Sequence, residues 1–376
     1  EKLIAIAQKA KECGVELFVL DDGWFGARTT DHAGLGDWVA NPDRLPEGIT
    51  GIAEDIEKVG LKFGLWFEPE MTNKDSDLYR EHPDWILSVP GRHDSHGRFQ
   101  YVLDFSRKEV VDRIYEMMAK ILSTAKVSYV KWDMNRSITE CYSAALPADR
   151  QGEVFHRYIL GVYDLYERLT STFPHVLFES CASGGGRFDP GILYYAPQGW
   201  TSDDTDAIER LSIQEGTELI YPLSTMGAHV SDCPNHTVGR STPFMTRAHV
   251  ALAGTFGYEL DITKISEEER AMIPEQVSMY HKYNDLVREG DYYRVASYRE
   301  NGLYDCWMVV AKDKSEALVT YVQVLGRPNV HSRKIKLLGL DVTAGYRLDG
   351  TDEVYGGDLL MNAGMLVEDM RGDYMS

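Results

Sequence analysis

The sequence predicts an α/β fold, a (β/α)8 TIM barrel lacking its first strand, followed by a small antiparallel β domain. Over about the first three quarters of the 376 residues, short apolar runs alternate with segments of helical period. Acidic and polar residues gather where each apolar run ends. Beyond residue 288 the runs are shorter and are separated by Gly, Asp and Asn turns.

Seven apolar runs are expected to form the parallel strands of the barrel. They cover residues 16–20, 61–67, 127–130, 176–178, 198–202, 218–223 and 255–260, and the strands end near residues 22, 68, 133, 181, 203, 228 and 261. Nearly unbroken apolar strands belong to a parallel sheet covered by helices. The carboxyl ends of barrel strands build the active site, so the polar residues that follow them are candidates for chemistry.

Amphipathic helices are expected between the strands, at residues 49–59, 110–122 and 155–169. A first helix over residues 3–10 closes at Gly14, a typical C-terminal cap. Because this helix should follow a strand and the sequence does not begin with Met, we expect the chain to be a fragment of a longer protein. A barrel without one strand leaves unpaired edges, so the isolated chain should be poorly soluble or inactive.

A long helix beginning at Ser266, with Glu269 completing a capping box, ends the predicted barrel. The barrel is assigned to residues 1–288 and a C-terminal antiparallel β-sandwich domain to residues 289–376. Strands of this domain are expected at residues 292–296, 306–311, 317–324, 334–338, 346–348 and 359–361.

The composition argues against several classes of partner. The formal net charge of −20 disfavours nucleic acid and anionic membranes. No apolar run reaches the roughly 18 residues that a membrane span needs. The five cysteines form no CxxC pair, which fits neither a disulfide framework nor a zinc site and indicates a reducing cytoplasm.

Two acidic motifs at predicted strand ends carry the chemistry. The first is Lys131-Trp132-Asp133-Met134-Asn135, and the second is Ser202-Asp203-Asp204-Thr205-Asp206. Cleavage of a glycosidic bond needs one carboxylate to attack or stabilise the cationic carbon and another to protonate the leaving oxygen. The sequence therefore predicts a glycoside hydrolase.

Five motifs give this prediction a family. They are Leu20-Asp21-Asp22-Gly23-Trp24-Phe25-Gly26, Gly64 to Met71, Lys131 to Arg136, Cys181-Ala182-Ser183-Gly184-Gly185-Gly186-Arg187, and Thr201 to Ala207. Together, and in this order, they resemble bacterial α-galactosidases of glycoside hydrolase family 36. The resemblance implies a retaining enzyme that releases terminal α-galactose from melibiose, raffinose and stachyose. It also implies a preceding β-sandwich domain, homo-oligomers of the full-length protein, and no cofactor or metal.

The resemblance makes Asp133 the nucleophile and Asp203 the general acid/base. Asp133 must stay ionised, and Lys131, two residues away on the same strand face, is expected to supply the neighbouring positive charge. Asp203 must hold a proton in the first step. Asp204 is the alternative acid, and either residue could instead cap a helix over residues 207–214.

The substrate-binding residues implied by the resemblance are Asp21, Asp22, Trp66, Arg98, Lys131, Asn135, Cys181, Gly184 and Asp204. The pair Asp21 and Asp22 would grip the galactose hydroxyls, unless it only forms a turn. Trp66 would be an apolar wall or a core residue. Arg98 would contact substrate or form a surface ion pair.

Cys181 would line the sugar pocket, because no His in its motif supports a thiol nucleophile. The glycines after it lack the Lys and Ser/Thr of a phosphate loop, so close approach of Gly184 to a sugar is favoured. His229 is read as a loop residue rather than a catalyst.

Two other functions stay open on the residues alone. A metal-dependent barrel hydrolase or isomerase could use Asp21, Asp22, Glu68 and Glu70, since hard cations accept such oxygen ligands. A sugar-binding or transglycosylating relative would keep the same pocket with weak hydrolysis.

Overall fold

The computed structural model describes residues 1–329, 333–367 and 370–376. It divides into two compact units, Glu1–Trp200 and Thr201–Ser376. None of the helices in the described ranges is long and apolar enough to cross a bilayer.

The first unit is built on parallel strands in the order β1-β2-β5-β6-β7. These are β1 (Leu17–Leu20), β2 (Lys62–Phe67), β5 (Tyr129–Trp132), β6 (Leu177–Ser180) and β7 (Gln198–Trp200). A short antiparallel pair, β3 (Met71–Thr72) with β4 (Tyr101–Val102), follows the end of β2. Each parallel strand lies within or beside a run that the sequence predicts.

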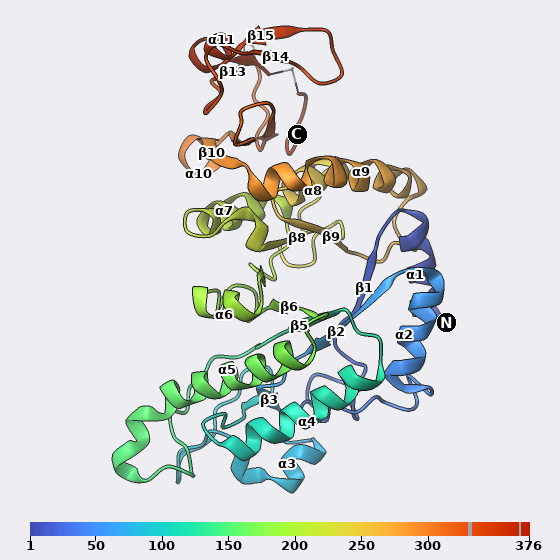
Figure 1. Ribbon diagram of the computed structural model, residues 1–376, viewed down its shortest axis with the longest axis vertical. Helices are drawn as coiled ribbons and strands as arrows, with labels where there is room; N and C mark the ends of the chain where they lie inside the picture. The colour runs from blue at the N-terminus through green and yellow to red at the C-terminus, as the bar shows by residue number, and fades with distance from the viewer. Residues whose placement is uncertain (330–332, 368–369) are drawn as a thin grey trace. The chain divides into compact units, whose positions relative to one another are not determined.

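Helices alternate with these strands. They are α1 (Lys2–Glu12), α2 (Gly48–Val59), α3 (Asp77–Glu81), α4 (Lys108–Thr124), α5 (Val154–Thr172) and α6 (Pro190–Tyr195), with 3-10 turns at Pro83–Trp85 and Ala148–Glu153. Helices α4 and α5 run side by side (Figure 1). Ile114 and Met118 of α4 and Val162 and Leu165 of α5 are fully buried in one core cluster. This spacing of three and four residues is the helical period that predicted both helices.

The second unit continues the alternation with α7 (Ala207–Glu218), β8 (Met226–Ser231), α8 (Phe244–Ala251), β9 (Thr255–Glu259) and α9 (Glu267–Glu289). Strands β8 and β9 are parallel partners. Ser266 caps α9, with its side chain accepting from the Glu269 N–H at 3.1 Å. The Glu269 carboxylate accepts from Arg247 Nη2 at 2.6 Å and not from the Ser266 N–H, so only the Ser266 half of the predicted capping box forms.

The rest of the second unit is mainly antiparallel. Its elements are β10 (Asp291–Ala296), α10 (Tyr298–Asn301), β11 (Tyr304–Val310), β12 (Ala317–Gln323), β13 (Lys334–Ile335), β14 (Gly345–Arg347), β15 (Val354–Gly356), α11 (Gly357–Asn362) and β16 (Met365–Leu366). Strands β10, β11 and β12 form one sheet, and the pairs β13-β16 and β14-β15 form two small ones. The domain boundary at residue 288 stays a prediction.

Two predicted strands are wrong. Residues 218–223 include the end of α7 and a turn before a 3-10 helix at Leu223–Thr225, and the strand begins at Met226. Leu219 and Ile220 are 80% and 77% exposed, so this apolar run is not a buried one. Residues 359–361 lie in α11, where Leu360 is buried but Leu359 is exposed.

Candidate active site

Asp133 lies directly after β5 and is held by three hydrogen-bond donors. Trp66 Nε1, from β2, donates to Asp133 Oδ2 at 3.2 Å, and Asn135 Nδ2 donates to the same oxygen at 2.6 Å. The Met134 N–H donates to Oδ1 at 2.8 Å. Asp133 is 7% exposed, so these donors fix the orientation of a nearly buried carboxylate.

Lys131 has a different partner from the one the sequence suggested. Its Nζ donates to Asp21 Oδ2 at 2.9 Å and not to Asp133. Glu179 is its register neighbour on β6. Burial by itself lowers the pKa of Lys131, but the charges of Asp21 and Glu179 raise it above its usual value. Lys131 therefore forms its ion pair with Asp21, and its expected role as the positive charge near Asp133 stays a prediction.

Glu68 is a buried carboxyl next to Asp133 that sequence reasoning considered only as a metal ligand. It accepts hydrogen bonds from Gln100 Nε2 at 2.9 Å and from the Asn135 N–H. Burial, and then the charge of Asp133, raise the pKa of Glu68 from 4.5 to about 8. At neutral pH the carboxyl of Glu68 is therefore protonated. Its position after an apolar strand was the only signal in the sequence.

Asp21 and Asp22 follow β1 and have separate cationic partners. Arg28 makes a two-pronged contact with Asp22, with Nη2 to Oδ2 at 2.7 Å and Nε to Oδ1 at 2.9 Å. Arg28 is buried, whereas the side chains of Asp21 and Asp22 are 57% and 38% exposed. The pair therefore presents anchored carboxylates to solvent, where sugar hydroxyls could bind. Sequence reasoning missed Arg28.

Trp66 and Arg98 are placed differently from each other. Trp66 is 2% exposed, packs in the core cluster and donates to Asp133, so the core position is confirmed while the wall role stays a prediction. Arg98 is exposed and has a φ of 53°, and the following Phe99 has a φ of 59°. Two consecutive left-handed residues are costly and are typical of functional loops. Among the ion pairs of the described residues, none includes Arg98.

The loop after β6 reaches Asn135. Ser183 Oγ donates to Asn135 Oδ1 at 3.1 Å, and Ser183 and Gly184 have positive φ values of 48° and 87°. Cys181 is 1% exposed. Burial, and then Asp133, raise the pKa of its thiol, so it is not an ionised nucleophile at neutral pH.

Glu70 belongs to a buried network of protein groups. Its carboxylate accepts from Trp132 Nε1 at 2.8 Å, from the Tyr158 hydroxyl at 2.5 Å and from Arg187 Nη1 at 2.7 Å. Protein donors thus already bind Glu68 and Glu70, and within the described ranges no group of three or more His, Cys, Asp or Glu could hold a metal ion. The rival metal site built from these residues has no support in this geometry.

In the second unit, residues 201–206 form what we call the acidic loop, which leads into α7. Asp206 is the N-cap, accepting from the N–H groups of Ile208 and Glu209 at 3.0 Å each. Asp204 Oδ1 accepts from the Asp206 N–H at 3.1 Å, while Asp203 is exposed. The capping alternative for Asp203 and Asp204 is therefore wrong, because Asp206 does it.

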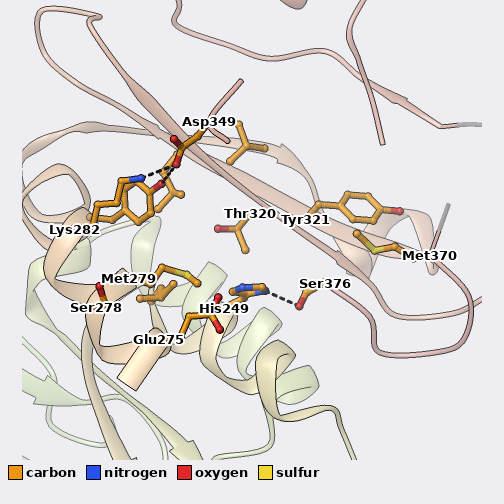
Figure 2. A pocket seen from close by; sticks show the side chains of 14 residues that line it. His249, Glu275, Ser278, Met279, Lys282, Thr320, Tyr321, Asp349, Met370 and Ser376 are labelled. Carbon is orange, nitrogen blue, oxygen red and sulfur yellow. Dashed lines mark hydrogen bonds and ion pairs between the residues drawn. The ribbon is translucent and has the colours of Figure 1, made fainter. Parts of the chain in front are cut away.

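His229 lies within β8, opposite Gly257 of β9, and not in a loop. The second unit also contains a cavity of about 560 Å³, whose lining includes none of the predicted site residues (Figure 2). In it, Lys282 and Tyr283 bond Asp349 at 2.6 and 3.2 Å. These groups satisfy one another and suggest no catalytic pair.

Comparison with known proteins gives the family. Residues 1–290 match the family model described as Melibiase, and residues 304–376 match the one described as glycosyl hydrolase family 36 C-terminal domain. The chain belongs to glycoside hydrolase family 36. It is 53% identical over 376 residues to alpha-galactosidase AgaA of Geobacillus stearothermophilus and 50% identical over 374 residues to an alpha-galactosidase of Lactobacillus acidophilus. It covers 51% of each, so the chain spans about half the length of these curated relatives.

Solved structures of family 36 members confirm the fold class. A crystal structure of AgaA superposes on this chain with a TM-score of 0.97 at 53% sequence identity. The match covers 100% of this chain and 52% of the AgaA chain. An AgaA variant in complex with raffinose gives the same TM-score at 52% identity. The predicted barrel class and the resemblance to family 36 α-galactosidases are thus both confirmed.

Proposed function

We propose that this chain carries the catalytic carboxylates of a retaining α-galactosidase. The enzyme would hydrolyse terminal non-reducing α-D-galactosyl residues of melibiose, raffinose-type oligosaccharides and related α-galactosides. The observation that carries the proposal is Asp133, a carboxylate fixed by three donors at the end of a parallel strand. Membership of family 36 and relatives that are named alpha-galactosidases support it.

In the first step, Asp133 attacks the anomeric carbon of galactose while Asp203 gives its proton to the leaving oxygen. A bond forms between the carboxylate and the anomeric carbon as the glycosidic bond breaks, and the configuration inverts. Trp66 and Asn135 hold one oxygen of Asp133 and Met134 N–H holds the other, so little reorganisation is needed. Glu68, neutral at pH 7 because its pKa is raised to about 8, adds no competing charge.

In the second step, Asp203 takes a proton from water, which attacks the same carbon. The ester bond to Asp133 breaks, the configuration inverts again, and galactose leaves with its original anomeric configuration. A sugar acceptor competing with water would give transglycosylation from the same intermediate. The ratio of galactose to transfer product measures that alternative.

Recognition of galactose is assigned to the residues around Asp133. The anchored carboxylates of Asp21 and Asp22 accept sugar hydroxyls, and Lys131 holds Asp21 in place. Carboxylate acceptors are strong enough partners to discriminate the axial hydroxyl of galactose from the equatorial one of glucose. Arg98, Cys181, Gly184 and Asp204 complete the proposed binding set.

The proposal extends to the protein's setting. Five cysteines without a disulfide support a cytoplasmic location. The first family match ends at residue 290 and the second begins at residue 304. These limits support a boundary between a barrel and a C-terminal β domain near residue 289. A homo-oligomer of the full-length protein is proposed from the resemblance alone, and light scattering would test it.

Hydrolysis of nitrophenyl α-galactoside, compared with the α-glucoside and the β-galactoside, tests the function. The protein at its full natural length should cleave the α-galactoside and release galactose first as the α-anomer. Equal rates on the α-glucoside would contradict the galactose assignment. First release of the β-anomer would contradict retention.

A further inference from the structure

The acidic loop is held by α7, the helix that it leads into, and by the end of β8 together with the segment that follows β8. Arg210 of α7 is buried and bonds the Ser202 carbonyl through Nη2 at 3.2 Å. On the other side, Ser231 Oγ donates to the Thr205 carbonyl at 3.0 Å, and Asn235 Nδ2 donates to Thr205 Oγ1 at 3.3 Å. Two structural segments thus converge on a stretch of six residues.

Arg240 makes the charged contact of this segment. Its guanidinium bonds the Asp206 carboxylate and lies 3.0 Å from Glu209 Oε1. The Asp206 side chain is 1% exposed, whereas that of Arg240 is 24% exposed. Removing Arg240 would leave a buried carboxylate without its counter-charge, which is unfavourable.

The turn that presents Arg240 is itself well ordered by hydrogen bonds. Asn235 Oδ1 accepts from the N–H groups of Thr237 and Val238 at 2.9 and 3.1 Å. The Asn235 N–H donates to the Arg240 carbonyl at 2.9 Å, and its carbonyl accepts from Gly239 N–H at 2.8 Å. Asn235 is 4% exposed. The position of Arg240 is therefore set by a closed turn and not only by its pairing with Asp206.

A shift of Asp206 would be transmitted to Asp203 by two hydrogen bonds within the acidic loop. Asp204 Oδ1 accepts from the Asp206 N–H at 3.1 Å, and the Asp204 N–H donates to Ser202 Oγ at 3.0 Å. Because these bonds join residues 202, 204 and 206, they restrict the backbone on both sides of Asp203. A general acid must lie within hydrogen-bond reach of the leaving oxygen, and a displacement of about 1 Å can lower turnover by about 100-fold.

We propose that Arg240, presented by the Asn235 turn, is a positioning residue that holds the acidic loop so that Asp203 can protonate the leaving group. The inference rests on the proposed function and deepens it. It assigns to the segment after β8 a part in catalysis without contact with substrate.

The test uses the dependence of kcat/KM on the leaving group in the protein at its full natural length. Raffinose needs a proton on its leaving sugar, whereas 2,4-dinitrophenyl α-galactoside does not, because its phenolate is already a good leaving group. Arg240→Met should lower kcat/KM about 10- to 100-fold for raffinose and less than about 3-fold for the aryl substrate. Arg240→Lys keeps a positive charge next to the Asp206 carboxylate. It should therefore show the same selectivity between the two substrates with a smaller loss of kcat/KM.

Arg288→Met is the matched control, because Arg288 also faces two carboxylates, Asp285 and Glu289, but on an exposed face of α9. Arg288→Met should leave kcat/KM unchanged for both substrates. Equal losses on the two substrates, or no loss, would overturn the positioning role. If Arg240→Met does not fold, the same comparison on Arg240→Lys decides.

Asp203→Asn separates this inference from the proposed function. If that variant shows the leaving-group selectivity and the Arg240 variants do not, only the positioning role fails. If Asp203→Asn itself loses activity equally on both substrates, the assignment of the acid fails.

Discussion

Replacing Glu68 with Gln should stabilise the protein at neutral and alkaline pH. Glu68 is fully buried, and burial followed by the charge of Asp133 raises its pKa from 4.5 to about 8. Glutamine has nearly the shape of the protonated side chain. Gln100, its hydrogen-bond partner, has a buried Oε1 without a partner in the described structure, which could accept from the new amide after rotation.

The magnitude follows from the two pKa values. Between pH 4.5 and about 8 the folded state binds a proton that the unfolded state has lost, so the free energy of unfolding falls as pH rises. A difference of about 3.5 between the pKa values, at about 1.4 kcal/mol for each, gives a loss of about 5 kcal/mol by pH 8. The loss is absent below pH 4.5 and complete above about pH 8. Gln cannot ionise, so Glu68→Gln removes this slope.

Urea unfolding of both proteins at several pH values from 5 to 9 measures the effect. The difference in the free energy of unfolding between the variant and the wild-type protein should increase steadily up to about pH 8 and stay constant above it. Glu109→Gln is the control. The pKa of Glu109 is lowered by a backbone hydrogen bond and by Arg107, so removing this carboxylate cannot stabilise the folded protein. A difference between Glu68→Gln and wild type that stays flat across this range would refute the reasoning.

Four further substitutions have defined outcomes. Asp133→Ala should abolish turnover and keep the fold, and azide should restore cleavage of an activated substrate with a β-galactosyl azide product; an α-azide by NMR would give Asp133 the acid role instead. Gly161→Ala would place its Cβ 1.9 Å from the Phe105 carbonyl oxygen and should lower stability by more than about 2 kcal/mol, whereas Gly216→Ala, in a helical position with open space, should raise it by about 0.5–1 kcal/mol in urea unfolding. Ser266→Ala should cost about 1 kcal/mol, since Ser266 caps α9, and an unchanged midpoint would show that the cap contributes nothing.

The fold was predictable wherever burial follows apolarity. The runs before Glu68 and Asp133 are buried strands, and the helical period of residues 110–122 gives a buried face in α4. Leu219 and Ile220 defeated the same rule because they are exposed. Apolar residues on the surface are common, and only the tertiary structure distinguishes them from a strand.

The positions of the candidate site residues at strand ends were predictable from the sequence, but their pairings were not. Asp133 and Asp21 follow strand ends, as expected for a barrel. The bond of Lys131 to Asp21 and that of Trp66 to Asp133 depend on the strand order β1-β2-β5 and on side-chain direction, which periodicity does not contain. The protonated state of Glu68 depends on burial beside another carboxyl, which is likewise a tertiary property.

Trp66 both packs in the core and donates to Asp133, and this limits which substitutions position 66 can accept. A substitution at this position would alter the core packing and the orientation of the Asp133 carboxylate together, so a gain in one is offset by a loss in the other. Asp21 and Arg98 are exposed and carry no comparable packing duty. Natural drift and laboratory selection for new sugars should therefore accumulate changes around Asp21 and Arg98 and leave Trp66 unchanged.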